Sequence, residues 1–117
     1  MQLPSEAELL RVYIGESDKR SRRALYEEIV AEARQRGMAG ATVLHGVAGF
    51  GASSRLHTSR ILRLSENLPV VVEIVDKPER IEAFLPYLDE VIRSGGGLIT
   101  LEKVRILAYC HGQQKDG

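Results

Sequence analysis

A nearly unbroken run of valine and isoleucine constrains this chain most: Leu68 to Val75 reads Leu-Pro-Val-Val-Val-Glu-Ile-Val. Continuous apolar runs of this length are typical of a strand that is covered on both faces. A helix can cover one face, and a second subunit is the simplest cover for the other. The run therefore predicts a buried strand in a homo-oligomer whose sheets face inwards.

Three further strands and two helices are predicted around this run. Alternating apolar residues predict a strand from Ala7 to Gly15, and small and β-branched residues predict another over residues 40–50. The last strand is predicted over residues 98–109. Apolar residues at helical spacing predict one helix over residues 19–36 and a second helix directly after Asp76.

The helix starts carry recognisable signals. Ser17 or Asp18 is the expected N-cap of the first helix. Asp76 is the expected cap of the second, and Glu79 three residues later completes a capping box. The run Lys19-Arg20-Ser21-Arg22-Arg23 then places four positive charges at a helix start, where the helix dipole disfavours them. Either a solvated face or an anionic or subunit partner explains this cluster.

The element order is strand, helix, strand, long loop, strand, helix, strand. Two βαβ halves of this kind predict an α+β ferredoxin-like sandwich, in which a four-stranded antiparallel sheet carries two helices on one face. The 117 residues fit a single domain. Its core is expected over about 7–109, with a long loop over 51–67 and a polar tail over 110–117.

Composition argues against several classes of function. The 16 basic and 16 acidic residues balance, so no net field draws the protein to nucleic acid or to an anionic membrane. A single cysteine, Cys110, rules out an internal disulfide and fits a reducing compartment. No apolar run is long enough for a transmembrane helix, and residues 1–6 lack the pattern of a secretion signal. We expect a cytoplasmic protein that is not membrane-embedded.

Two glycine-rich segments are the candidate binding elements, Gly46 to Gly51 and Gly95 to Gly97. Backbone amides at glycines can form a concave set of donors for phosphate. Neither segment matches a Walker sequence or the turn of a dinucleotide-binding fold. A helix C-cap and a strand bulge explain such glycines equally well.

No catalytic constellation stands out in the sequence. Serines and a threonine surround His57, but there is no nucleophile-elbow sequence, and the carboxylate pairs fall on expected solvent faces of helices. We therefore expect no enzyme activity and no required cofactor. A metal site shared between subunits, with His57, Cys110 and His111 as ligands, stays open as an alternative.

Several motifs together resemble one family. They are Leu25 to Val30, Gly37 to Val43, Gly49-Phe50-Gly51, His57, Leu64 to Asp76, Phe84-Leu85-Pro86 and Leu98 to Val104. Across roughly residues 7–109 they resemble the DUF190 family of domains of unknown function, which is similar to the PII nitrogen-regulatory signalling proteins. The resemblance implies a ferredoxin-like homotrimer with its sheets around the three-fold axis and an adenine nucleotide in clefts between neighbouring subunits.

The resemblance also implies residue roles. The nucleotide-binding residues would be Gly46, Gly49, Phe50, Gly51, His57, Gly95, Gly96, Gly97 and Arg105. The loop 51–67, with Arg55, Arg60 and Ser65, stands where the PII effector loop stands. Leu98 and Leu107 replace a lysine and a second arginine of PII proteins, so fewer cationic groups favour AMP or cyclic AMP over ATP.

The function implied is regulation of a partner protein through the loop, with a membrane transporter or channel as a candidate partner. A divalent-metal-responsive trimer of the ion-tolerance type is the main alternative. A small hydrolase or transferase ranks last.

Overall fold

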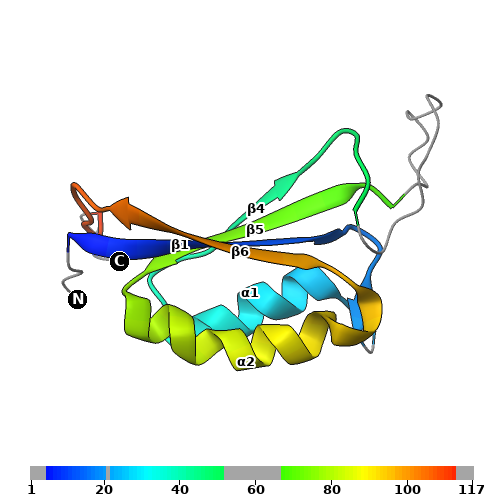
Figure 1. Ribbon diagram of the computed structural model, residues 1–117, viewed down its shortest axis with the longest axis horizontal. Coiled ribbons are helices and arrows are strands. Elements are labelled where there is room, and N and C mark those ends of the chain that lie inside the picture. Colours follow the sequence, from blue (N-terminus) through cyan, green and yellow to red (C-terminus); the bar gives the residue numbers. More distant parts are fainter. Residues whose placement is uncertain (1–4, 21, 52–66, 113–117) are drawn as a thin grey trace, which may run out of the picture.

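A computed structural model describes residues 5–20, 22–51 and 67–112 of the chain (Figure 1). Its elements are β1 (Glu6–Gly15), β2 (Lys19–Arg20), β3 (Arg23–Ala24), α1 (Leu25–Gln35), β4 (Thr42–His45), β5 (Pro69–Asp76), α2 (Pro78–Gly95) and β6 (Leu98–Arg105). Four strands form an antiparallel sheet in the order β4-β5-β1-β6, and both helices lie under the same face of it (Figure 1). The predicted α+β ferredoxin-like sandwich is confirmed.

The hydrophobic core lies between the helices and the two central strands. Val12 of β1 stands opposite Val72 of β5, and both are fully buried, as are Ile29 of α1 and Phe84 of α2. Burying a side chain of this size stabilises the fold by about 1.5–3 kcal/mol. The alternation of buried and half-buried residues along β5 shows that only one face of this strand is fully covered within the chain.

The other face of the sheet carries apolar residues that the helices do not cover. Tyr13 stands opposite Leu98 on β6, and their exposed fractions are 36% and 54%, while Leu44 on β4 is 49% exposed. We call this surface the outer face. Its exposed Tyr13, Leu44 and Leu98 form apolar surface in contact with water, and exposed apolar surfaces commonly mark contact with another molecule.

A charged cluster crosses the middle of the outer face. Arg11 Nε donates to Glu73 Oε2 at 2.9 Å, and Arg11 Nη1 donates to Glu102 Oε1 at 2.7 Å. The three residues come from the adjacent strands β1, β5 and β6. The hydrogen bonds to Glu73 and then Glu102 raise the pKa of the Arg11 guanidinium.

The first helix begins later than predicted. The short strands β2 and β3 pair antiparallel before α1, so the basic cluster precedes α1 rather than lying in its first turn. That turn carries Glu27 and Glu28, whose negative charges suit the positive end of the helix dipole. The N-cap is Ala24, and Asp18 instead accepts a hydrogen bond from the Gly15 N–H at 2.8 Å.

The predicted capping box at the second helix was also wrong. Asp76 is the buried last residue of β5, and Lys77 is the N-cap of α2 without a side-chain capping bond. Asp76 Oδ1 accepts from the Lys77 N–H at 2.7 Å, and Oδ2 accepts from the Ala39 N–H at 2.9 Å. The carboxylate therefore joins the β5–α2 junction to the α1–β4 connection.

Both edge strands are shorter than predicted. Strand β4 covers Thr42–His45 rather than residues 40–50, and β6 ends at Arg105 rather than Tyr109. The residues left over at these strand ends are the ones that build the candidate site. No helix in the described ranges is long and apolar enough to cross a membrane.

Candidate functional site

The first glycine segment follows β4 and packs against the start of β5. The Gly46 N–H donates to the Pro69 carbonyl at 2.8 Å, and a Cβ on Gly46 would lie 2.8 Å from Pro69 Cγ. Gly49 has a φ of +145° and also approaches Pro69. Gly51 has open space around it, and Phe50 is 66% exposed. Packing thus accounts for the first two glycines, whereas Phe50 and Gly51 are accessible.

The second glycine segment joins α2 to β6. Gly96 has a φ of +85°, which favours glycine, and its N–H donates to the Ile92 carbonyl at 2.8 Å. A Cβ on Gly97 would lie 3.2 Å from each of three atoms, Tyr13 O, Ile14 Cγ2 and Ile92 Cγ2. Nothing lies within 4 Å of the Cβ position of Gly95. The fold itself therefore favours glycine at Gly96, by its positive φ, and at Gly97, by close packing, but not at Gly95.

The structure does not bring the predicted binding residues together within one chain. The two glycine segments lie at one end of the sheet but on its opposite edges, β4 and β6. Three inter-strand spacings separate these edges, which is about 14 Å. Gly97 directly precedes β6 and Arg105 is its last residue, and the eight residue steps between them span about 26 Å.

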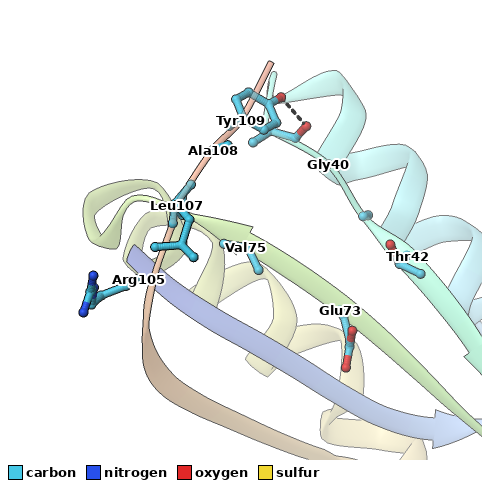
Figure 2. Close-up of a pocket in the computed structure, with 11 residues that line it drawn as sticks. Gly40, Thr42, Glu73, Val75, Arg105, Leu107, Ala108 and Tyr109 are labelled. Atoms are coloured by element: carbon cyan, nitrogen blue, oxygen red, sulfur yellow. Dashed lines mark hydrogen bonds between the residues drawn. The ribbon is translucent and has the colours of Figure 1, made fainter. Parts of the chain in front are cut away.

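The end of the sheet that carries Arg105 holds a cleft that the sequence did not predict. Its volume is about 700 Å³, and it is lined by residues 39–42 before and within β4, by Glu73 and Val75 of β5, and by residues 105–109. Figure 2 shows Val75 and Leu107 inside the cleft and the Arg105 side chain pointing away from them at its rim. We call this the Arg105 cleft.

A single hydrogen bond closes one end of the Arg105 cleft. The Tyr109 hydroxyl donates to the Ala39 carbonyl at 2.8 Å (Figure 2). This bond ties the segment after β6 to the connection between α1 and β4, which Asp76 holds from its other side. The cleft is thus bounded by three segments that are far apart in the sequence.

The turn after β1 holds Asn67, the first described residue after the 52–66 stretch, and contacts His45 at the end of β4. On one side, His45 Nδ1 lies 3.4 Å from Glu16 Oε2. On the other, the Ser17 N–H donates to Asn67 Oδ1 at 2.6 Å, and Asn67 Nδ2 donates to Asp18 Oδ1 at 3.0 Å. The candidate residues Arg55, His57, Arg60 and Ser65 lie outside the described residues.

A metal centre gains no support from the described ranges. Within them, no three His, Cys, Asp or Glu side chains gather in a way that could hold a metal ion. Cys110 is an exposed free cysteine, and the ring of its neighbour His111 packs edge-on against Tyr109 with ring centroids 5.4 Å apart.

Sequence reasoning identified Arg105 but missed Glu73, Tyr109 and residues 39–42. Glu73 carried the clearest signal, because it is the one charged residue inside the Val-Ile run. The predicted strands over residues 40–50 and 98–109 include residues 40–42 and Tyr109, and this prediction concealed their part in a cleft.

Comparison with known proteins relates the chain to uncharacterised relatives. The model of the family DUF190, described as "Uncharacterized ACR, COG1993", matches residues 7–106. A UPF0166 protein from Aquifex aeolicus is 36% identical over 99 residues, which cover 85% of this chain and 91% of that relative. A UPF0166 protein from Methanocaldococcus jannaschii is 39% identical over 94 residues, or 80% of this chain and 86% of the relative.

Proposed function

The chain belongs to the DUF190 family, and from this membership we propose that it is a PII-like regulatory protein. It is proposed to act as a cytoplasmic homotrimer that binds an adenine nucleotide between subunits, with AMP or cyclic AMP preferred over ATP. Segment 51–67 would then report the bound state to a partner protein, such as a membrane transporter or channel.

The distance along β6 carries this proposal. Gly97 directly precedes β6 and Arg105 ends it, so the two residues lie about 26 Å apart, and one chain cannot place both on the same phosphate. A site that uses both residues needs two chains. The outer face supports such an assembly, because a trimer with its sheets inward would bury Tyr13, Leu44 and Leu98.

The chemistry of the Arg105 cleft supports a nucleotide with few charges. Its volume of about 700 Å³ lies in the range of small-molecule sites. Val75 and Leu107 offer apolar surface to a base. Among the described residues that line the cleft, Arg105 is the only cation. Its side chain points away from the cleft at the rim (Figure 2), so it would contact a phosphate bound at the rim, where one guanidinium suits one phosphate group through charge-assisted hydrogen bonds.

A regulatory role also needs two states that the nucleotide distinguishes. A ligand shifts such an equilibrium only by its difference in affinity for the two states. The turn after β1 supports this role for segment 51–67, because it holds Asn67, the last residue of that segment, and contacts His45 at the end of β4. Ligand contacts within the segment would then change its conformation while Asn67 stays in place.

Calorimetric titration with AMP, cyclic AMP, ADP and ATP tests the proposal. We expect saturable binding, tightest for AMP or cyclic AMP. Arg105→Ala should weaken AMP by roughly tenfold and adenosine much less, because a hydrogen bond to a charged group contributes roughly 1.5–3 kcal/mol. Arg34→Ala, at an exposed arginine of α1, is the matched control. No binding of any adenine nucleotide would overturn the proposal.

Sedimentation tests the assembly separately. The chain has a mass of 13.0 kDa, and we expect three times this mass at micromolar concentration. Val71→Lys, which places a charge on the half-buried outer face of β5, should lower the measured mass towards one chain. A concentration-independent mass of one chain for the unaltered protein would contradict the homotrimer.

A further inference from the structure

A second cleft lies beside the first turn of α2 and uses none of the glycine segments. It has a volume of about 570 Å³ and is lined by residues 6–8 of β1, Pro78 of α2 and residues 103–105 of β6. Figure 1 shows the start of β1 and the end of β6 extending beyond the first turn of α2. We call it the β1–β6 cleft.

Two pairs of opposite charges stand along this cleft. Glu8 pairs in register with Lys103, and Glu6 pairs with Arg105. Side chains of directly opposed residues lie on the same face with their Cβ atoms about 4.5–5.5 Å apart. The four charged side chains therefore form two rungs on one face of the β1–β6 ribbon, with the carboxylates on one strand and the cations on the other.

These rungs do not close into ion pairs. The ion pairs between described residues involve other side chains, such as Arg11 with Glu73 and Arg36 with Glu32. Neither Glu8 nor Lys103 forms an ion pair with another described residue. Opposite charges that are adjacent but unpaired remain available to a molecule that enters the cleft.

One carboxylate oxygen in the cleft lacks a donor. Glu8 Oε1 is buried and has no hydrogen-bond partner among the described residues. Buried polar atoms in folded proteins nearly always have a partner, and an acceptor left without one is unfavourable. Rotation of the Glu8 carboxylate towards the cleft would let a donor supplied by a ligand, such as an ammonium group, satisfy this oxygen.

We propose that the β1–β6 cleft binds a small zwitterion of the amino-acid or dipeptide class. Its ammonium group would lie against Glu8 and Glu6, and its carboxylate against Lys103 and Arg105. A ligand of one sign would meet two like charges as well as two opposite ones, whereas a dipolar ligand matches both strands. The cleft volume lies within the range of small-molecule sites, and this site goes beyond the nucleotide proposed above.

An NMR titration of the nucleotide-free full-length chain tests the site. The probe is L-alanyl-L-alanine, compared with N-acetyl-L-alanyl-L-alanine, which lacks the ammonium group, and L-alanyl-L-alaninamide, which lacks the carboxylate. We expect saturable shifts of backbone amides in residues 6–8 and 103–105. Each blocked form should bind about tenfold more weakly, because it loses a charge-assisted contact.

Charge-neutralising variants assign the contacts. Glu8→Gln and Lys103→Gln should each weaken the dipeptide by about tenfold, while Glu90→Gln, at an exposed position of α2, should leave its affinity unchanged. Urea unfolding of each variant verifies that it is folded.

Three results would overturn the proposal: no saturable shift with the dipeptide, equal affinity for the blocked forms, or shifts located away from this cleft. Because no nucleotide is present, failure here leaves the nucleotide proposal standing, and failure of nucleotide binding leaves this site standing.

Discussion

The two ends of the sheet are held together in different ways. At the end where β6 begins, the chain is tightly packed around Gly46 and Gly97, and the side chains of Asp18 and Asn67 hold the turn after β1. At the end where β6 finishes, polar side chains hold the connections, with Asp76 and Tyr109 both bound to Ala39. The second arrangement leaves room for two clefts.

This difference changes how the glycines are interpreted. A glycine-rich segment in the sequence indicates a place where backbone is accessible or where space is short, and the sequence does not distinguish the two. In this structure, short space explains Gly46 and Gly97, whereas the open surfaces belong to Gly51 and Gly95. The comparison between the two ends can be tested by variants that affect one end at a time.

The largest effect is expected at Asp76. Asp76→Ala leaves two N–H groups, those of Ala39 and Lys77, without their carboxylate acceptor. Each buried donor left unsatisfied costs about 1–3 kcal/mol, so we expect a loss of roughly 2–4 kcal/mol in the free energy of unfolding, measured with urea. Asp76→Asn retains one acceptor oxygen and should lose less. If Asp76→Ala lowers the free energy of unfolding less than Gly97→Ala does, the Asp76 side chain is not the main stabilising contact at this end of the sheet.

A smaller loss is expected from Gly97→Ala. The added methyl group would lie 3.2 Å from three atoms, one of which is the Tyr13 carbonyl oxygen, and overpacking of this kind costs about 1–3 kcal/mol. Gly40→Ala, beside the Arg105 cleft, adds a methyl group with nothing within 4 Å and should change stability by less than about 0.5 kcal/mol. If Gly97→Ala and Gly40→Ala lower the free energy of unfolding equally in urea, the two ends of the sheet do not differ in how closely they are packed.

Most of the fold could be predicted because burial follows a simple period. Val70, Val72 and Ile74 alternate with half-buried neighbours, and Ile81, Phe84, Leu88 and Val91 recur at helical spacing and are buried. The start of α1 could not be predicted, because β2 and β3 have only two residues each, too few to produce a period. Asp76 was misread for a related reason: its sequence context matches a cap, but its acceptor bonds reach Ala39, 37 residues away.

The site was less predictable than the fold. The Arg105 cleft combines residues 39–42, β5 and residues 105–109. No local sequence pattern indicates that these distant segments lie side by side. The charged rungs of the β1–β6 cleft depend on the register of β1 against β6, which a single sequence does not specify. Arg105 was found only through a resemblance to a family, and it lines both clefts.

A modest effect is expected from Tyr109→Phe. This change removes one hydrogen bond, from the hydroxyl to the Ala39 carbonyl, and a single bond of this kind contributes about 0.5–1.5 kcal/mol. We expect a small fall in the urea midpoint and, under the proposed function, a several-fold loss of AMP affinity as the cleft wall loosens. If stability falls but AMP affinity is unchanged, the Tyr109 hydrogen bond supports the fold and not the ligand site.

The smallest effect on stability, and the sharpest test of the glycine end, is expected from Gly95→Ala. Gly95 is the last residue of α2 and has nothing within 4 Å of its Cβ position, and alanine is the better helix former by up to about 1 kcal/mol. Stability should therefore hold or rise slightly in urea unfolding. If AMP affinity falls while stability holds, the lost binding reflects close approach of phosphate to this backbone, and the glycine end belongs to the site. If AMP binds as before, Gly95 takes no part in phosphate binding. Gly96 and Gly97, which backbone conformation and packing already explain, would then be the remaining candidates at this end of the sheet.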